Sequence, residues 1–347
     1  MQGALFETNI KYQILDKLLT YYITNVQYSN EINMFIDLKS IFKKVYRTDI
    51  NSIIKEQRIV IEDITSHIIN MIGFYRNYFY KKGKYTNVYL LYSTSECSLL
   101  KEIYPDYKKD YYNKYFNNQD EYKNLNNIIK SSVKQIIAIT KYIPHTYFID
   151  TSNCDEFCYF NYLSRHSGNS LNIVFSNDPI LFQVLNKNTI ALTIKGENST
   201  VITENDAIKY LLEKDTILTG NSLNILLSIA GDKEYSLPNI PTYSYKKAEK
   251  LLIPFFKNLT LTDKTYMNFP NELFSNSILN NNKNMILKNF ALIFPIEIQM
   301  SNENKIIENL SFSKIKPNFS YNELLELNQK IFLLFPLNLN MIMKGEL

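Results

Sequence analysis

Two carboxylates stand where buried β-strands are expected to end. Asp37 follows the apolar run Met34–Ile36, and Asp178 comes three residues after the apolar stretch Leu171–Phe175. In open α/β sheets, sites form beyond the carboxyl ends of the strands, so both side chains are expected at one edge. Carboxylate oxygens at such an edge suit a hard divalent cation such as magnesium. The same aspartates could instead cap a following helix or accept hydrogen bonds from a loop.

Cysteine and histidine side chains give less definite patterns. Cys154, Cys158 and His166 offer three zinc ligands without a familiar ligand spacing, and ordinary buried thiols explain the two cysteines better. His67, His145 and His166 have no paired nucleophile, so we assign them no catalytic role. These residues by themselves indicate no catalytic class.

The hydrophobic pattern predicts a sheet that would hold the carboxylates. Short buried runs are separated by helical segments of about a dozen residues or more, which implies parallel strands in an α/β fold. Apolar residues recur at steps of three and four from Ile61 to Tyr75, which is typical of a long amphipathic helix that Gly83 ends. The expected elements are a helix over residues 9–25, strands over 34–38, 87–92, 171–175 and 189–194, and a helical region from about residue 215.

The composition predicts a globular, intracellular protein. The 347 residues are 45% hydrophobic and 21% charged, and the net charge of +4 is only mildly basic. Three cysteines indicate a reducing compartment. We see neither a signal peptide nor a run of about 20 apolar residues, so we expect no membrane partner. The abundance of Ile, Asn, Lys and Tyr is typical of an AT-rich genome, and we hypothesise a viral or phage source and the host cytoplasm as location.

Four segments, taken in order, resemble the 5′-to-3′ exonuclease and flap endonuclease family. Residues 35–40 (FIDLKS) are similar to its opening strand with the first metal-binding aspartate, and residues 99–108 (LLKEIYPDYK) to a helical-arch segment. Residues 173–184 (IVFSNDPILFQV) are similar to the motif ivSgDkDllQLv. Residues 230–248 are similar to GDssDnIPGvpGIGpKtA, which contains a helix-hairpin-helix. The family includes PIN-like nucleases and phage exonucleases of the ribonuclease H type.

The resemblance implies a fold and a division of the chain. The fold would be α/β, with a parallel-sheet, PIN-like 5′-nuclease domain and a C-terminal helical lobe like a helix-hairpin-helix. The expected parts are an N-terminal helical extension over 1–29, the nuclease-like domain over 30–215 with an arch-like segment at about 95–130, a degenerate helix-hairpin-helix over 216–260, and a C-terminal region over 261–347.

The resemblance also implies divalent metal ions, Mg or Mn, bound by a dense acidic cluster. Matching positions give Asp37, Asp178 and Asp232 as ligands, together with the pair Asp155 and Glu156 from the segment that stands for the family's EADD helix. The register of that segment is ambiguous, because a second alignment puts Phe157 and Cys158 at the acidic positions. We expect at most one weak or vestigial metal site from this set, and no firm catalytic residue.

Several acids and glycines of the family's pattern are replaced here. Tyr92 or Ser93 stands at the second-strand aspartate, Ile180 at the second aspartate of SgDkD, and Tyr235 at the second acid of GDssD. The glycines of GIG, which let backbone N–H groups approach a phosphate, are replaced in the segment 242–244 (TYS). These losses in separate motifs favour relaxed demand on the chemistry.

Basic and aromatic side chains remain for nucleic-acid contact. Lysines can neutralise phosphates, and tyrosines can stack on unpaired bases. The residues expected to do so are Tyr104, Tyr107, Lys108, Lys109, Lys114, Lys246 and Lys247.

The preferred hypothesis is a 5′-nuclease-like protein that binds branched or single-strand-containing DNA and has lost most or all hydrolysis. It would serve as a structural or accessory subunit of a viral replication or transcription assembly. One alternative is an active, divergent Mg- or Mn-dependent exonuclease or flap endonuclease. Another is a protein-interaction scaffold without DNA affinity, whose docking surface would be an apolar patch near residues 285–345.

Overall fold

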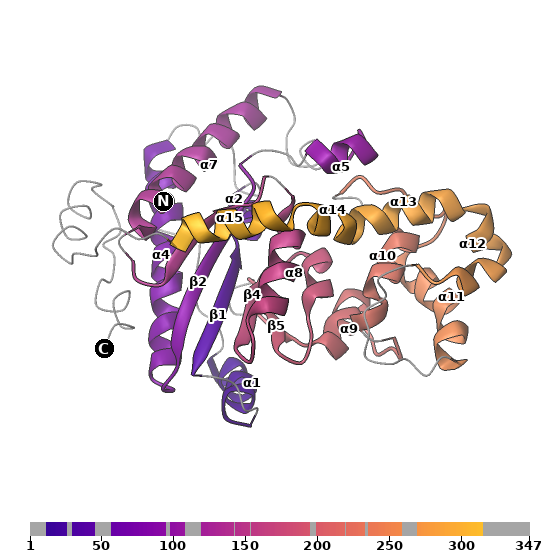
Figure 1. The fold of residues 1–347 in the computed structure, drawn as a ribbon, viewed down its shortest axis with the longest axis horizontal. Coiled ribbons are helices and arrows are strands. Elements are labelled where there is room, and N and C mark those ends of the chain that lie inside the picture. Colours follow the sequence, from indigo (N-terminus) through magenta and orange to yellow (C-terminus); the bar gives the residue numbers. More distant parts are fainter. Residues whose placement is uncertain are drawn as a thin grey trace.

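The computed structural model describes residues 12–25, 30–45, 57–94, 98–107, 119–141, 143–152, 154–194, 199–218, 220–232, 235–258 and 269–314. Its centre is a six-stranded sheet in the order β3-β2-β1-β4-β5-β6 (Figure 1). All neighbouring strands are parallel except β5 and β6, which are antiparallel. The strands are β1 (Glu31–Asp37), β2 (Tyr85–Tyr92), β3 (Thr146–Asp150), β4 (Leu171–Phe175), β5 (Thr189–Leu192) and β6 (Val201–Ile202).

Helices cover both faces of the sheet, as parallel strands require. Alternate residues of a strand point to opposite faces, so in β1 Phe35 packs in one apolar core, and Met34 and Ile36 pack in the other. The core around Met34 is closed by α1 (Tyr12–Asn25), α2 (Leu38–Val45), α4 (Gln57–Tyr80) and α7 (Gln119–Thr140).

The core around Phe35 continues without a break into the helical half of the molecule. It includes residues from the sheet, from α8 (Glu156–His166) and from later helices as far as Ile306. The helices of this half are α5 (Ser98–Ile103), α9 (Ala207–Leu212), α10 (Leu223–Ala230), α11 (Tyr245–Asn258), α12 (Ser277–Asn281), α13 (Lys283–Ile293), α14 (Ile296–Ser301) and α15 (Glu303–Lys314), with short 3-10 turns at Pro179–Val184, Glu204–Asp206, Gly220–Ser222 and Asn271–Ser275.

The sequence pattern predicted most of this frame. The predicted mixed α/β fold with a mostly parallel sheet is confirmed, as is the helical half that follows it. The strand predicted over 34–38 lies at 31–37, because Leu38 already begins α2. Strands β3 and β6 were not predicted. The division into an N-terminal extension, a nuclease-like domain and two C-terminal regions stays a prediction.

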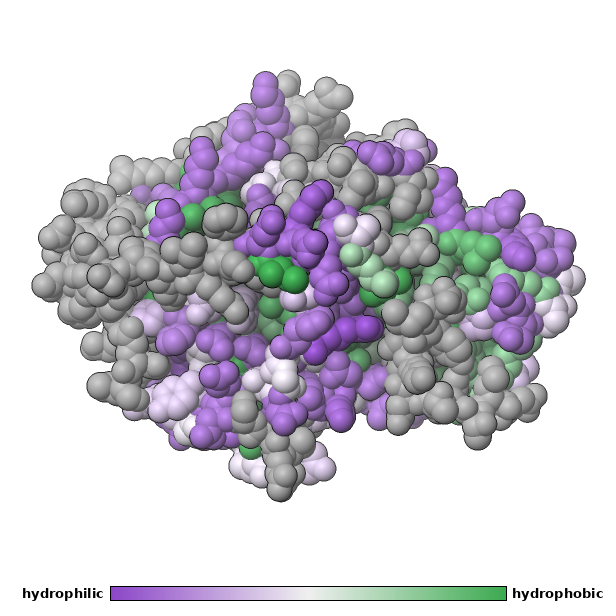
Figure 2. Space-filling model, in the orientation of Figure 1, coloured by the Kyte–Doolittle hydropathy of each residue, from purple (hydrophilic) through white to green (hydrophobic). Residues whose placement is uncertain are grey.

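Figure 2 shows the face across which α15 passes, where hydrophilic side chains predominate and hydrophobic ones are exposed in small groups. Among the described residues, no helix combines the length and the apolar character that crossing a bilayer requires.

Candidate functional site

Asp37 ends β1 and is almost completely buried, with 1% of its surface exposed. One carboxylate oxygen, Oδ1, accepts the backbone N–H of Lys39 at 3.0 Å. The other, Oδ2, accepts hydroxyl hydrogen bonds from Ser40 at 2.6 Å and from Ser176 at 2.7 Å. The first turn of α2 and the segment after β4 therefore both close on this carboxylate, and at least three protein groups solvate its charge.

The directions of these hydroxyl bonds follow from their other partners. Ser40 Oγ also accepts the backbone N–H of Asn177 at 3.0 Å, and Ser176 Oγ accepts that of Asp178 at 3.0 Å. A carboxylate can only accept, so each hydroxyl must donate its single hydrogen to Asp37. Each serine hydroxyl therefore connects a backbone N–H of the segment after β4 to the carboxylate at the end of β1 by two hydrogen bonds.

Asp178 is satisfied from two sides and is 3% exposed. Its Oδ1 atom accepts the backbone N–H of Ile180 at 3.0 Å, which caps the 3-10 turn Pro179–Val184. Its Oδ2 atom accepts the phenolic hydrogen of Tyr235. The side chain therefore performs the capping role that was one of its two sequence interpretations.

Tyr235 fills the space between the strand ends and the helical half. The buried ammonium nitrogen of Lys39 lies 5.0 Å from the centre of its ring, which is a cation–π distance. On another side the ring of Tyr107 packs at 5.8 Å between centroids. Tyr235 thus links Asp178, through its hydroxyl, to the ammonium of Lys39, which lies over its ring.

This donor set does not fit a two-metal centre. Such a centre needs a dense cluster of oxygen acceptors, and two like charges 4 Å apart repel by about 4 kcal/mol at an effective dielectric of 20 unless cations separate them. Here Ile180 is a buried apolar residue, and Tyr235 donates its hydrogen to Asp178. Lys39 brings positive charge into the same region. The described part of the chain contains no group of three or more His, Cys, Asp or Glu side chains placed to hold a metal ion.

Asp155 and Glu156 lie at the start of α8, and each is 6% exposed. Asp155 is the N-cap residue, and its carboxylate accepts the N–H of Phe157 at 3.2 Å. Its backbone has φ 94° and ψ 151°, a region that is essentially restricted to glycine and costs of order 1–3 kcal/mol. The structure therefore gives Asp155 a capping function, and within the described ranges the pair belongs to no group of three or more possible metal ligands.

The three residues of the alternative zinc site do not meet. Cys158 is buried and donates its S–H to the carbonyl of Cys154 at 3.2 Å. His166 is exposed eight residues further along the same helix, about 12 Å away at 1.5 Å per residue. The cysteines are structural thiols, as expected.

Asp232 belongs to a tight turn. Its backbone pairs with Leu237 in both directions, and its carboxylate accepts the N–H of Tyr235 at 3.1 Å and the hydroxyl of Tyr245 at 3.2 Å. Gly231 before it has φ +66°, and a Cβ there would lie 2.6 Å from the carbonyl oxygen of Leu237. Asp232 is half-buried within this turn and orders it locally.

Helices α10 and α11 pack against each other in the region predicted to be a degenerate helix-hairpin-helix, and phosphate binding there stays a prediction. The segment 231–244 joins the two helices in the sequence. Thr242 has φ +70°, so a β-branched residue keeps the left-handed backbone in a segment where the family has glycines. Lys246 and Lys247 follow in the first turn of α11, and both are exposed.

The residues of the arch-like segment that were predicted to contact nucleic acid differ in their exposure. Tyr107 is 4% exposed and belongs to the core beside Tyr235, so its ring is not available to a base in this structure. Tyr104 is half-buried, and the ammonium of Lys288 lies 4.4 Å from its ring centre. The predicted contacts Lys108, Lys109 and Lys114 lie outside the described residues.

Sequence reasoning missed several groups of this site. Ser40 and Ser176 were not singled out, although each stands two or three residues from a predicted aspartate. Asp150 ends β3 beside Tyr92 and is exposed, with hydrogen bonds from the hydroxyls of Thr94 and Ser152. It was missed because strand β3 was not predicted.

The fold is that of the PIN-like 5′-nucleases, as structural comparison shows. A pseudo-enzyme–product complex of the bacteriophage T5 flap endonuclease with DNA and metal ions superposes with a TM-score of 0.54 at 13% identity, covering 90% of this chain and 99% of that one. The bacteriophage T5 5′-exonuclease with bound zinc gives the same score and identity, covering 87% and 98%. No protein-family model and no curated protein matches the sequence.

Proposed function

We propose that this protein binds nucleic acid on a 5′-nuclease fold and has lost, or nearly lost, metal-dependent hydrolysis. The observation that carries the proposal is the state of Asp37 and Asp178. Both are buried and hold hydrogen bonds from protein donors, and Tyr235, the donor to Asp178, has the ammonium of Lys39 5.0 Å from its ring centre. A carboxylate whose lone pairs are used by hydroxyl and N–H groups gains little from a cation that must displace those donors.

The exposed lysines at the start of α11 support binding of nucleic acid. Lys246 and Lys247 project from the start of a helix that follows a tight hairpin, where the positive end of the helix dipole adds to their charge. The structures that share this fold include one solved with DNA. We infer that branched or single-strand-containing DNA is the ligand, and that residues 216–260 form the lobe that holds it.

A protein that binds without cutting would serve as a structural or accessory subunit. In this proposal its partners are DNA and other proteins of a viral replication or transcription assembly, and Mg or Mn is not needed for binding. The Lys39–Tyr235 contact would then stabilise the frame that presents the hairpin lysines.

The test is a gel experiment with end-labelled 5′-flap and blunt duplex DNA in magnesium, in manganese and in EDTA. We expect a shifted, uncleaved complex under all three conditions. The double variant Lys246→Ala, Lys247→Ala should weaken the shift. Lys130→Ala, Lys134→Ala, a matched pair of exposed lysines on α7, should not.

Two outcomes would contradict the proposal. Metal-dependent cleavage that disappears in Asp37→Ala and Asp178→Ala would make the protein a divergent nuclease. If the DNA is neither shifted nor cleaved, the interaction-scaffold hypothesis is favoured. The apolar patch predicted for that scaffold near residues 285–345 is described only as far as residue 314.

A further inference from the structure

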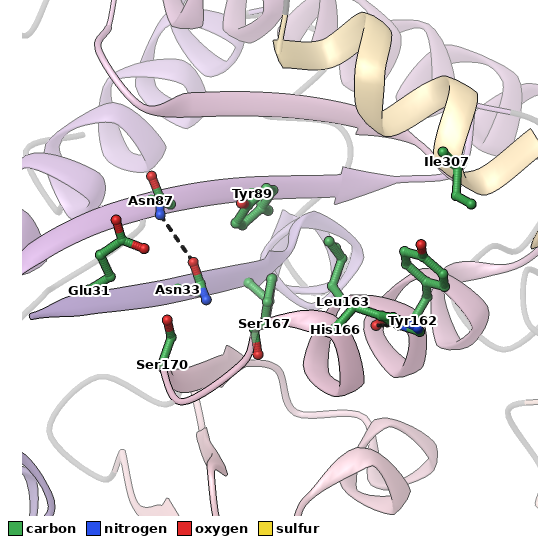
Figure 3. Close-up of a pocket in the computed structure, with 11 residues that line it drawn as sticks. Glu31, Asn33, Asn87, Tyr89, Tyr162, Leu163, His166, Ser167, Ser170 and Ile307 are labelled. Atoms are coloured by element: carbon green, nitrogen blue, oxygen red, sulfur yellow. Dashed lines mark hydrogen bonds between the residues drawn. The ribbon is translucent and has the colours of Figure 1, made fainter. Parts of the chain in front are cut away.

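A cavity of about 460 Å³ opens on one face of the sheet, apart from the strand-end aspartates. It lies beside the N-terminal parts of β1 and β2, and the last turn of α8 and the helix α15 border it (Figure 3). Its volume is within the range of small-molecule sites, roughly 300–1,000 Å³. Its lining includes Asn33, Phe35, Asn87, Tyr89, Tyr162 and His166.

Three asparagines stand in register across the sheet beside this cavity. Asn33 on β1 pairs with Asn87 on β2 and with Asn172 on β4. The Asn172 end of the row is anchored at the end of α8, because its amide nitrogen donates to the carbonyl of Ser164 at 3.3 Å and to Ser167 Oγ at 2.7 Å. A carbonyl can only accept, so the Asn172 nitrogen faces this end and the Asn172 oxygen faces Asn33.

The orientation of Asn172 fixes the other two amides. Asn33 donates to the Asn172 oxygen at 3.1 Å, and Asn87 donates to the Asn33 oxygen at 3.2 Å. Figure 3 shows the Asn87 oxygen turned away from Asn33, and within the described ranges no residue donates a hydrogen bond to it. Asn87 therefore presents to the cavity an acceptor oxygen and the second hydrogen of its amide nitrogen.

Tyr89 is a second lining residue with unused hydrogen-bonding capacity. It stands two residues after Asn87 on β2, so both side chains project from the same face of the sheet, about 7 Å apart along the strand. Tyr89 is 7% exposed, and its ring packs against Phe35 and Tyr147, each at 5.2 Å between centroids. A buried phenol usually has a hydrogen-bond partner, yet no residue in the described part of the chain bonds to this hydroxyl. A ligand in the cavity would supply the partner.

Two rings of α8 form another part of the lining. The imidazole of His166 stacks on Tyr162 at 4.1 Å between centroids, and Figure 3 shows both residues across the cavity from the asparagines. Nδ1 of His166 donates to the carbonyl of Tyr162 at 2.8 Å, so the neutral imidazole keeps Nε2 as an acceptor. This end of the cavity therefore offers aromatic surface and one further acceptor.

A carboxamide that presents its oxygen beside an N–H makes two hydrogen bonds to one edge of a nucleobase, as asparagine does with the amino group and a ring nitrogen of adenine. Aromatic side chains add contact with the faces of a base. We propose that the cavity binds an adenine nucleoside, with the edge of the base on Asn87 and the ribose hydroxyls toward Tyr89 and His166. The base amino group donates to Asn87 Oδ1, and the remaining Asn87 N–H donates to a ring nitrogen of the base.

This site is independent of the proposed DNA function. It is formed by residues of β1, β2 and α8, whereas the hairpin lysines proposed to contact DNA lie on α11. Adenine is also part of a DNA strand, so a base of bound DNA has the same recognition chemistry as a free nucleoside. Adenosine binding with and without an oligonucleotide distinguishes the two sources, and neither measurement requires that DNA binds at α11.

The experiment is isothermal titration calorimetry of the full chain with adenosine, with 6-dimethylaminopurine riboside and with maltose. Adenosine should bind saturably at a one-to-one ratio. The dimethylamino analogue has no amino hydrogen for Asn87 Oδ1, so it should bind at least about fivefold more weakly, and maltose should not bind. Asn87→Ala should weaken adenosine binding at least about fivefold, the low end for a bidentate contact, and Tyr89→Phe about fivefold, the effect of one neutral hydrogen bond.

The matched control is Tyr21→Phe, because Tyr21 is exposed on α1 and lies outside the cavity lining. It should leave adenosine affinity unchanged, and circular dichroism checks that each variant is folded. If Asn87→Ala does not fold, Tyr89→Phe and the dimethylamino analogue decide between the outcomes.

Equal affinities for adenosine and the dimethylamino analogue would overturn the proposal, as would wild-type affinity in both Asn87→Ala and Tyr89→Phe. Maltose binding as strong as that of adenosine would assign the cavity to a saccharide and overturn it, and so would a lack of adenosine binding at millimolar concentration. Adenosine should bind equally well in an excess of octadeoxyadenylate. Loss of adenosine binding in that mixture would assign the cavity to a base of a DNA strand and overturn the free nucleoside as its ligand.

Discussion

Replacing Asp37 by asparagine tests whether this carboxylate has a structural role or binds a metal ion. The substitution keeps the shape of the side chain, and its amide oxygen can still accept the N–H of Lys39. The new amide nitrogen cannot accept the hydroxyl hydrogens of Ser40 and Ser176, whose oxygens already accept backbone N–H groups. Two hydroxyl hydrogens in a site that is 1% exposed then lose their acceptor. At about 1–3 kcal/mol for each buried unsatisfied group, the free energy of unfolding should fall by about 3 kcal/mol.

The assay is urea unfolding followed by circular dichroism, in EDTA and in 10 mM magnesium chloride. If Asp37 is satisfied by protein donors, the loss should be the same in both buffers, and magnesium should leave the wild-type midpoint unchanged. A metal bound to the native state at a hundred times its dissociation constant would instead stabilise the wild type by about 2.7 kcal/mol. That stabilisation would be absent in Asp37→Asn.

The control is Asp215→Asn, a fully exposed carboxylate whose only described ion pair is with Lys209 at 3.8 Å. It should change stability by less than about 0.5 kcal/mol. The reasoning is refuted if magnesium stabilises the wild type alone, or if Asp37→Asn in EDTA is as stable as the wild type.

Three further predictions use other features. Thr242→Gly should stabilise the chain by about 1 kcal/mol in the same urea assay, because glycine removes the cost of a left-handed backbone at φ +70°; a loss of stability would contradict this. Lys246→Ala, Lys247→Ala should lower the slope of log affinity for DNA against log salt by about 2, as fluorescence anisotropy would show, and an unchanged slope would remove both lysines from the interface. Burial is the main cause that raises the pKa of Tyr89 to about 12, so the stability that this phenol contributes is complete below pH 10 and is lost as the pH rises towards 12. In Tyr89→Phe the free energy of unfolding should therefore fall less steeply over this pH range, and a fall as steep as in the wild type would contradict the prediction.

Most strands and helices could be predicted from the sequence because their hydrophobic periods are local properties of the chain. Asp37 and Asp178 were placed at strand ends from the apolar runs that precede them, and both lie there. Strand β3 (Thr146–Asp150) was not predicted because buried and exposed residues do not alternate regularly along it, and two of its five residues are half-buried. Its terminal carboxylate, Asp150, was missed with it. The helix over 119–140 was also only partly foreseen.

The sequence by itself determined the α/β class, the presence of two strand-end aspartates and the non-acidic residues Ile180 and Tyr235 at positions where the resemblance implies acids. Those properties depend on residue type and on spacing along the chain. Only the tertiary structure decided which groups contact the two aspartates. It brought Tyr235, 57 residues away in sequence, to Asp178, and Ser176, 139 residues away, to Asp37. Hydrogen bonds between such distant residues depend on how strands and turns pack, and for that reason the sequence could show which residue types stand near the strand ends but not which donors bond to the aspartates.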